Sequence, residues 1–336
     1  MASELDSKIA ALIVIYNNNL IQLSKYRTTT SNSIMSSRLN VVQKRAAINN
    51  LTINYNTQVT FFKNKLAADI QALRVAAAAA VVVVPAVVVP SNKKALLIGC
   101  NYLGTKYELK GCINDTNNIK DKLSASYGFT NIKLMTDETV MKPTRQNIIN
   151  EITGLLANAV SGDTLFILFS GHGTSYKDAN NDEIDGMDEL FVPLDFNCIS
   201  DDEMKLILQN NLKTGVKLLA LFDSCHSGTM FDLKYQYLDS TNYNNATVND
   251  KSVETIGNVC LISGCMDSQT SADAFINNKS QGAMTWAFLD TLNKSSSLTW
   301  NSLITNMRTS LKTSNYGQIP QLSSGKLLDV NQPFSL

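Results

Sequence analysis

Hydrophobic and polar positions follow two different patterns along the chain, one on each side of a tract of alanine and valine. Over residues 1–74 the apolar side chains recur at the i, i+3, i+4 spacing of amphipathic helices. The positions are Ile9, Leu12, Ile13, Tyr16, Leu20 and Leu23, and later Phe62, Leu66, Ile70 and Leu73. The polar segment 28–37 between them predicts a turn. We therefore expect a helical N-terminal prodomain, which is more typical of partner binding than of catalysis.

Residues 75–89 are almost entirely alanine and valine, with Pro85 inside the tract and Pro90 directly after it. The tract is shorter than the roughly 20 residues that cross a membrane as a helix. Proline also breaks the middle of a helix. We interpret residues 75–93 as a linker between domains and expect no membrane association.

From Lys94 onward, short apolar runs alternate with amphipathic stretches. Strands are predicted at 95–99, 132–135, 165–169, 218–222, 259–263 and 321–323. Helices are predicted at 114–123, capped by Asn114 or Asp115, from about Thr144 to 156, and at 201–210, 284–292 and 298–311. Residues 233–256 are polar and predict a long exposed loop. Strands that alternate with helices indicate an α/β domain over 94–336, with a mostly parallel central sheet flanked by helices.

Two of the buried runs end in polar turns that carry reactive side chains. Residues 218–222 lead into Asp223, Ser224 and Cys225, and residues 165–169 lead into Ser170, Gly171 and His172. Because parallel strands place their carboxyl ends at one edge of a sheet, both turns should meet there. An imidazole that takes the proton of a thiol creates a nucleophilic thiolate. The pattern predicts Cys225 as nucleophile and His172 as general base and acid.

Two alternatives accompany this hypothesis. Cys225 is otherwise a small buried apolar residue and His172 a turn residue, as most free cysteines are inert. His226 is a second candidate base, ranked lower because neighbouring residues of an extended chain point to opposite sides. The small residues of both turns leave backbone amides accessible, and we expect the N–H groups of Gly173 and Cys225 to form an oxyanion hole.

Two acidic residues follow the carboxyl ends of predicted strands and are expected near the same edge. These are Asp115, at the start of a predicted helix, and Asp223, two positions before the cysteine. A pair of carboxylates in a partly desolvated pocket selects a guanidinium or ammonium group. The alternative is that Asp115 only caps its helix and Asp223 only ends its strand.

Composition narrows the remaining possibilities. The 29 basic and 29 acidic residues balance, and no basic stripe is present, so we expect no nucleic-acid partner. The six cysteines lack the paired spacing of a zinc site, and the two histidines are His172 and His226. The first residues lack the basic and apolar regions of a secretory signal. Free thiols and a cytoplasmic location are the expectation.

In nine sequence blocks the chain resembles the type I metacaspases, which are caspase-like cysteine peptidases, over essentially all of residues 94–336. The blocks are 95–99 (ALLIG), 111–115 (GCIND), 170–173 (SGHG), 185–189 (DGMDE), 201–204 (DDEM), 223–228 (DSCHSG), 263–265 (SGC), 269–273 (QTSAD) and 320–324 (PQLSS). The resemblance implies a caspase-like sandwich with the dyad at His172 and Cys225. It also implies cleavage after Arg or Lys, with Asp115 and Asp223 in the pocket for that residue.

The acidic segment 178–189 has acidic or amide residues at several EF-hand positions, but Glu183 stands where such a loop needs glycine. We reject an EF-hand. The resemblance implies a different Ca2+ site, made of Asp188, Asp201, Asp202 and Asp232. The alternative is that these are solvated loop acids, with Asp201 capping its helix. Bound calcium would order the turns that carry His172 and Cys225.

The sequence therefore predicts a calcium-dependent cysteine endopeptidase that acts on protein or peptide substrates with Arg or Lys at the cleavage site. Self-cleavage is predicted at Lys234 or Lys251, and near the linker at Lys65 or Arg74. The rival hypothesis is a non-catalytic caspase-like scaffold with a partner-binding N-terminus, and a ligase or transferase with the same dyad is a third. The resemblance also favours a monomer.

Overall fold

The computed structural model describes residues 2–79, 92–177, 187–225, 230–237, 246–249, 252–264, 273–276, 279–295 and 297–336. Contacts divide the chain into a helical hairpin and an α/β unit. Within the described ranges, no helix is both long and apolar enough to cross a membrane. The division into prodomain, linker and peptidase domain stays a prediction, because residues 80–91 of the linker lie outside these ranges.

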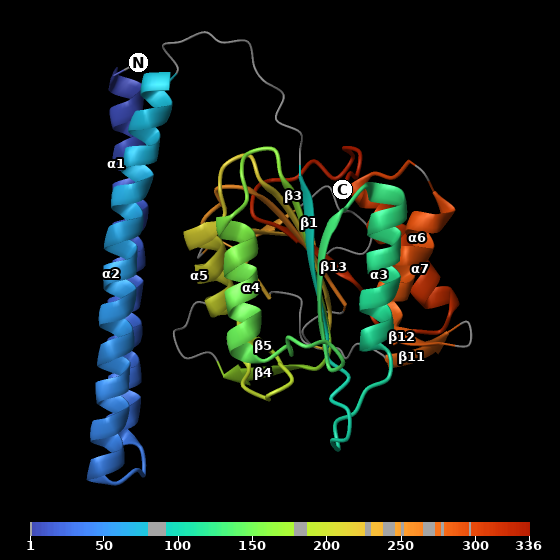
Figure 1. The fold of residues 1–336 in the computed structure, drawn as a ribbon, viewed down its shortest axis with the longest axis horizontal. Coiled ribbons are helices and arrows are strands. Elements are labelled where there is room, and N and C mark those ends of the chain that lie inside the picture. The colour runs from blue at the N-terminus through green and yellow to red at the C-terminus, as the bar shows by residue number, and fades with distance from the viewer. Residues whose placement is uncertain are drawn as a thin grey trace. The chain divides into compact units, whose positions relative to one another are not determined.

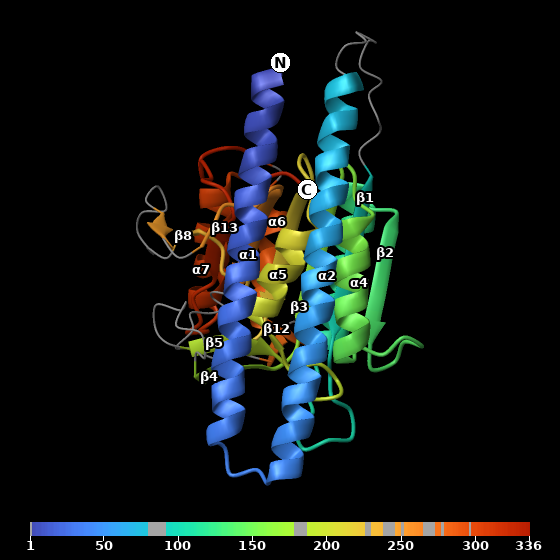
Figure 2. The ribbon, with the colours of Figure 1, turned by 90° about the vertical axis from the view of Figure 1, so that its left-hand side faces the viewer.

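The hairpin consists of two long antiparallel helices, α1 (Ala2–Ser36) and α2 (Val41–Ala79) (Figure 2). Tyr16 of α1 packs edge-to-face on Phe62 of α2, with ring centroids 6.3 Å apart. The Tyr16 hydroxyl donates a 2.6 Å hydrogen bond to Asp69. The predicted turn at 28–37 is wrong for most of its length. Hydroxyls such as that of Thr28, which donates to the Ser24 carbonyl at 3.0 Å, are satisfied inside the helix, so α1 continues to Ser36.

An eight-stranded sheet forms the centre of the α/β unit (Figure 1). Its order is β2 (Asn131–Thr136), β1 (Lys93–Gly99), β3 (Thr164–Ser170), β7 (Lys217–Asp223), β10 (Asn258–Ser263), β13 (Gln321–Ser324), β8 (Tyr235–Tyr237) and β9 (Thr247–Val248). Pairing is parallel from β2 through β10 and antiparallel from β10 to β9. The carboxyl ends of the parallel strands therefore share one edge.

Helices cover both faces of this sheet (Figure 1). One face carries α3 (Cys112–Tyr127), α6 (Ala283–Lys294) and α7 (Trp300–Thr313), and the other carries α4 (Arg145–Ala157) and α5 (Asp201–Asn211). Alternation along β1 serves both layers: Leu97 joins the core under α3 and α6, and Ile98 joins the core under α4 and α5. The predicted α/β class, with a mostly parallel sheet flanked by helices, is confirmed.

Several local predictions need correction. Gly111, not Asn114 or Asp115, is the N-cap of α3, because Asp115 already lies in the first helical turn. Ser200, not Asp201, caps α5 through a capping box with Glu203. The predicted exposed loop 233–256 contains β8 and β9, and the Tyr237 side chain of β8 is only 1% exposed.

Besides β8 and β9, five further short strands were not predicted from the sequence, because each has too few residues to display a period. A small sheet contains β4 (Gly173–Lys177), β5 (Met187–Phe191) and β6 (Ile199–Ser200). A second one pairs β11 (Asp273–Ile276) with β12 (Lys279–Gly282). Both lie at the end of the central sheet where β1 and β3 finish (Figure 1).

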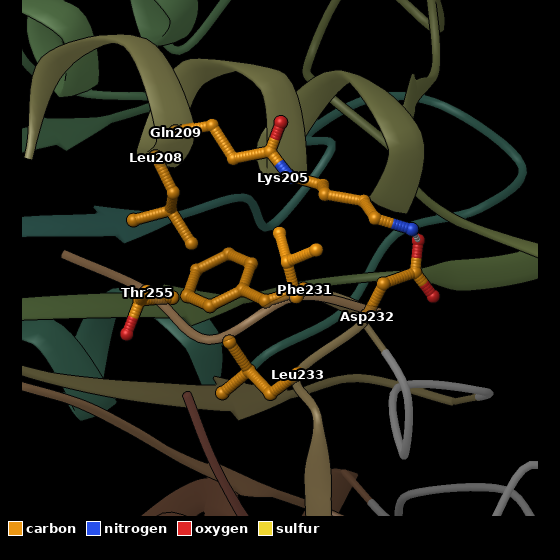
Figure 3. Close-up of a pocket in the computed structure, with 8 residues that line it drawn as sticks. Lys205, Leu208, Gln209, Phe231, Asp232, Leu233 and Thr255 are labelled. Atoms are coloured by element: carbon orange, nitrogen blue, oxygen red, sulfur yellow. Dashed lines mark hydrogen bonds and ion pairs between the residues drawn. The ribbon is translucent and has the colours of Figure 1, made fainter. Parts of the chain in front are cut away.

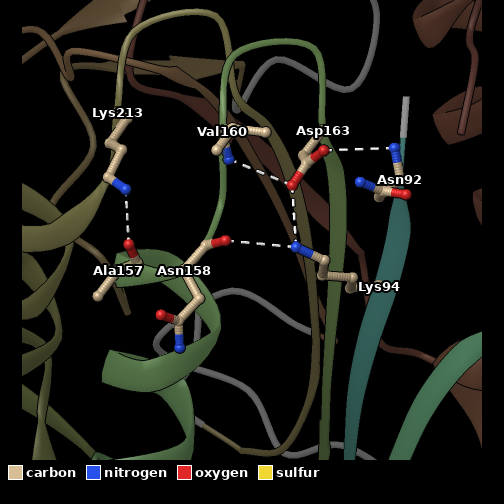
Figure 4. A network of polar contacts seen from close by, with 7 residues as sticks. All are labelled: Asn92, Lys94, Ala157, Asn158, Val160, Asp163 and Lys213. Atoms are coloured by element: carbon tan, nitrogen blue, oxygen red, sulfur yellow. Dashed lines mark hydrogen bonds and ion pairs between the residues drawn. The ribbon is translucent and has the colours of Figure 1, made fainter. Parts of the chain in front are cut away.

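A buried carboxylate stabilises the opposite end of β1 and β3 (Figure 4). Asp163 is 1% exposed and accepts hydrogen bonds from Lys94 Nζ at 3.0 Å, the Val160 N–H at 3.2 Å and the Asn92 N–H at 3.3 Å. Burial raises the pKa of Asp163, but the Lys94 ammonium and the two amides together lower it by more than burial raises it. The net pKa is therefore below the usual value.

We expect Asp163→Asn to lower the free energy of unfolding by about 2–4 kcal/mol at pH 7, because the ion pair between the buried carboxylate and the partly exposed Lys94 is lost. Because the pKa of Asp163 is depressed in the folded state, its ionised carboxylate stabilises the folded protein at pH values above the ordinary pKa of 3.8. This stabilisation is lost as the pH falls below that value. The difference between wild type and variant in urea unfolding should therefore shrink toward pH 3. Asp121→Asn, in an exposed pair with Lys120, is the control and should change little. An equal effect in both variants would contradict the assignment.

Candidate active site

The pairing of β3 with β7 brings the two predicted catalytic turns together. Ser170 lies opposite Asp223 in this register, so His172 and Cys225 each follow two residues after a paired position. A Cβ atom placed on Gly173 would lie 1.9 Å from the carbonyl oxygen and 3.2 Å from the amide nitrogen of Cys225. The backbones of the two turns are therefore in direct contact, and only glycine fits at position 173.

Two tyrosines that no sequence motif marks hold the His172 ring. Its Nε2 lies 2.8 Å from the Tyr107 carbonyl oxygen, which can only accept a hydrogen bond. Nε2 must therefore carry the proton, and Nδ1 is the basic atom of the neutral ring. The Tyr102 ring lies against the imidazole with centroids 4.8 Å apart, and its hydroxyl accepts a 2.9 Å hydrogen bond from the His172 N–H.

Tyr102 is itself rigidly placed. It is fully buried, it donates a 2.6 Å hydrogen bond to the Val192 carbonyl, and its backbone φ is +51°, which is uncommon outside glycine. No sequence period marks such a residue, because its partners belong to distant strands. Its position three residues after the end of β1 was the one available signal.

Cys225 differs in its position in the fold from the other thiols of the described chain. Burial raises the pKa of Cys260 to about 12 and also raises the pKa values of Cys100 and Cys198, which disfavours their thiolates. Cys225 is half-buried and lies two residues after the end of β7. Its position suits a nucleophile, whereas Cys100, Cys198 and Cys260 have the character of packing residues. His226, the alternative base, lies outside the described residues.

Asp115 and Asp223, predicted to flank one pocket, converge on Gly282. Asp115 is 0% and Asp223 is 5% exposed. A Cβ on Gly282 would lie 2.1 Å from Asp223 Oδ2 and 2.8 Å from Asp115 Oδ2. Ser170, the last residue of β3, donates a 2.7 Å hydrogen bond to Asp115. The two carboxylates thus form an acidic pair, although both are covered in this structure.

Of the four predicted calcium ligands, the structure couples Asp201 and Asp232 and adds Glu189. Burial, followed by the charges of Asp232 and Glu189, raises the pKa of Asp201 to about 10. The Asp201 Oδ2 accepts a 2.7 Å hydrogen bond from the Glu189 N–H. Asp232 adopts a φ of +46°, and its Oδ1 is buried without a hydrogen-bond partner among the described residues. Three buried carboxyl groups therefore share this region.

Lys205 extends from α5 toward Asp232, and its Nζ lies 3.3 Å from Asp232 Oδ2 (Figure 3). Asp188 lies next to Glu189 on β5, and Asp202 is partly exposed at the start of α5. Across the described part of the chain, no group of three or more His, Cys, Asp or Glu side chains has the spacing of a metal site. The carboxyl groups suit a hard cation by chemistry, but Lys205 and their present spacing would have to change.

The remaining predicted positions are scattered. Lys234 is half-buried beside β8, whereas Lys251 lies outside the described residues. Lys65 forms an ion pair with Asp69 at 2.8 Å on α2. Arg74 is helical, but its side chain is not among those described. The predicted oxyanion-hole amides of Gly173 and Cys225 belong to the contacting turns, and their role remains a prediction.

A thiol and an imidazole at the carboxyl edge of a parallel sheet flanked by helices define the class of caspase-like cysteine peptidases. The sequence matches the family described as "Metacaspase, peptidase C14 domain" over residues 93–234. It is 37% identical to Metacaspase-1 of Kluyveromyces lactis over 73% of this chain and 68% of that protein. It is also 37% identical to Metacaspase-1 of Meyerozyma guilliermondii, over 72% of each chain.

A crystal structure of a Geobacter sulfurreducens protein has the same fold, with a TM-score of 0.54 and 24% identity over 73% of this chain and 99% of that one. The chain belongs to the metacaspase family of cysteine-type endopeptidases. The predicted family, caspase-like fold and enzyme class are therefore confirmed.

Gly173→Ala should separate the two turns, because its methyl group would overlap the Cys225 carbonyl. A shift of about 1 Å in reacting groups lowers turnover roughly 100-fold. We expect at least that loss in kcat/KM for peptide hydrolysis. Gly154→Ala is the control, because a Cβ there would meet no atom within 4 Å beyond its chain neighbours and the backbone of its own helix. It should keep full activity and gain up to about 1 kcal/mol in unfolding free energy. Full activity of Gly173→Ala would contradict the contact.

Proposed function

We propose that the enzyme is a calcium-dependent endopeptidase that cleaves after Arg or Lys through Cys225 and His172 and processes itself. The contact of Gly173 with the Cys225 backbone carries the proposal, because it holds the thiol turn and the imidazole turn together. Substrates are proteins or peptides with a basic residue at the cleaved bond.

Proton transfer follows from the tautomer of His172. Nε2–H donates to Tyr107, so Nδ1 takes the Cys225 proton and leaves a thiolate and an imidazolium. The thiolate attacks the scissile carbonyl, and the Gly173 and Cys225 amides stabilise the resulting oxyanion. The imidazolium then protonates the leaving amine. Water activated by the neutral imidazole hydrolyses the acyl-enzyme and restores the thiol.

Specificity for Arg or Lys rests on the acidic pair Asp115 and Asp223. Carboxylates in a desolvated site attract a cation more strongly than exposed ones, since water screens the charge less. Both are covered in this structure, so a substrate side chain reaches them after the covering segments shift. Asp223 also precedes the nucleophile by two residues, which couples the bound side chain to the position of Cys225.

Calcium dependence rests on the buried carboxyl groups of Glu189, Asp201 and Asp232. A hard cation prefers such oxygen ligands and would relieve their mutual repulsion. Asp188 and Asp202 are adjacent residues that complete the proposed set. The ion would have a structural role: it would order the acidic segment against the chain that follows Cys225. It would take no part in the bond-making and bond-breaking steps. Lys205 would have to release Asp232.

Hydrolysis of a short peptide with Arg at the cleaved bond tests the activity. We expect wild type to cleave it and Cys225→Ala to be inactive, and Asp223→Ala to lose at least about ten-fold in kcat/KM. Mass spectrometry of both proteins should find fragments ending at Lys234 or Lys251, and at Lys65 or Arg74, in wild type alone. Fragments that persist in Cys225→Ala indicate a contaminating protease. Absence of any cleavage by wild type would favour a non-catalytic scaffold.

The calcium proposal has a stability test that does not need activity. Because the pKa of Asp201 is raised to about 10 when folded, the folded protein retains a proton that the unfolded chain releases above about pH 4. Stability without metal should therefore fall as pH rises toward 10.

Millimolar calcium should raise the Tm of wild type at pH 8 and remove much of this pH dependence, with magnesium as the control ion. Asp201→Asn should show a smaller pH dependence in chelator and no calcium shift. Peptide hydrolysis should be lost in chelator and restored by calcium. A wild-type Tm and activity that are both indifferent to calcium would refute the site.

A further inference from the structure

Helix α6 begins without a capping side chain of its own. Its N-cap is Gly282, which has no side chain to accept a hydrogen bond from the first turn. The acceptors come from the acidic pair instead. The Thr285 N–H donates a 2.8 Å hydrogen bond to Asp223 Oδ2, and the Gly282 N–H lies 3.0 Å from both oxygens of Asp115. The acidic pair therefore caps this helix from 62 and 167 positions earlier in the chain.

Thr285 contacts Asp223 twice. Its Oγ1 donates a second 2.8 Å hydrogen bond to the same Oδ2, and the residue is fully buried. Two donors on one oxygen fix the rotation of the carboxylate about its side-chain bonds. Gly282 provides the space in which the carboxylates approach, because a Cβ there would overlap Asp223 Oδ2 at 2.1 Å.

Two buried carboxylates that approach each other repel, and burial further disfavours their ionised forms. Hydrogen bonds from N–H and O–H donors favour the ionised form, and the positive end of a helix dipole acts in the same direction. The first turn of α6 supplies both effects to the acidic pair. The charge that a guanidinium or ammonium would recognise thus depends on this turn.

We propose that Thr285 is a positioning residue for substrate selection and that Gly282, which lacks a side chain, leaves the space that the two carboxylates occupy. In this way the first turn of α6 sets the orientation and charge of Asp115 and Asp223. The inference rests on the proposed preference for basic residues and adds Thr285 and Gly282 to the residues that determine it. Asn114 adds support, because its Nδ2 donates a 2.8 Å hydrogen bond to the Ser280 carbonyl and joins α3 to β12.

Selectivity between two matched peptides tests the assignment. One carries Arg at the cleaved bond and the other citrulline, which has the same shape without the charge. We expect Thr285→Val to lower the Arg-to-citrulline ratio of kcat/KM at least about ten-fold, mainly through a higher KM for the Arg peptide. Thr285→Ser retains the hydroxyl and should restore the wild-type ratio. The ratio does not depend on the fraction of enzyme that folds.

Thr291→Val is the matched control, since Thr291 is buried on the same helix and its Oγ1 has no hydrogen-bond partner among the described residues. It should keep the wild-type ratio. Gly282→Ala should lose cleavage after Arg, while iodoacetamide still alkylates Cys225 at the wild-type rate, as read by mass spectrometry. Loss of both would overturn a role confined to selection.

The outcomes separate the inference from the function beneath it. If wild type does not discriminate Arg from citrulline, the proposed specificity fails, and the role of Thr285 fails with it. If wild type discriminates and Thr285→Val matches it, the specificity stands and the assignment of Thr285 is overturned.

Discussion

The parallel pairing of β3 with β7 is the constraint on which the site depends. Both strands end at polar residues, and the register sets Ser170 opposite Asp223. A slip of one residue would displace one turn by about 3.3 Å and reverse the faces of the buried side chains. The core opposes such a slip, because alternate residues of each strand pack under different helices. The hydrophobic effect thereby holds the polar turns of His172 and Cys225 in contact.

Buried carboxylates show how the same cost of desolvation is offset in three ways. Asp163 is neutralised by the Lys94 ammonium and two amides, and it stabilises the ends of β1 and β3 far from the site. Asp115 and Asp223 are satisfied by Ser170 and the first turn of α6. Asp201 lies beside Asp232 and Glu189, and its raised pKa shows that its hydrogen bonds do not fully offset burial and the neighbouring negative charges. A bound cation should change the stability of the protein most at such a cluster, where the negative charge is not fully compensated.

Predictions from periodicity succeeded where burial and local pattern agree. The strands β1, β3, β7 and β10 are built around continuous apolar runs, and their bounds lie within two residues of those expected from the sequence. Predictions failed where tertiary contacts compensate a weak local signal. Polar residues from Thr28 to Ser36 remain helical, and the hydroxyls of Thr28 and Ser36 donate to backbone carbonyls one turn earlier. Tyr237 is buried inside a segment whose composition indicates an exposed loop, because β8 pairs with β13.

By itself, the sequence determined the α/β class, the strand ends that carry His172 and Cys225, and membership in the metacaspase family, because these depend on short-range polarity and on local motifs. Tertiary structure decided the rest. It made Nδ1 of His172 the basic atom, through the Tyr107 carbonyl, and it brought Glu189 to Asp201 and Asp232. It also turned Asp223 into the cap of a helix that begins 60 residues later, roughly a whole βαβ unit away. Such pairs meet only because the sheet and its helices fold distant segments onto one edge, and no local pattern encodes that distance.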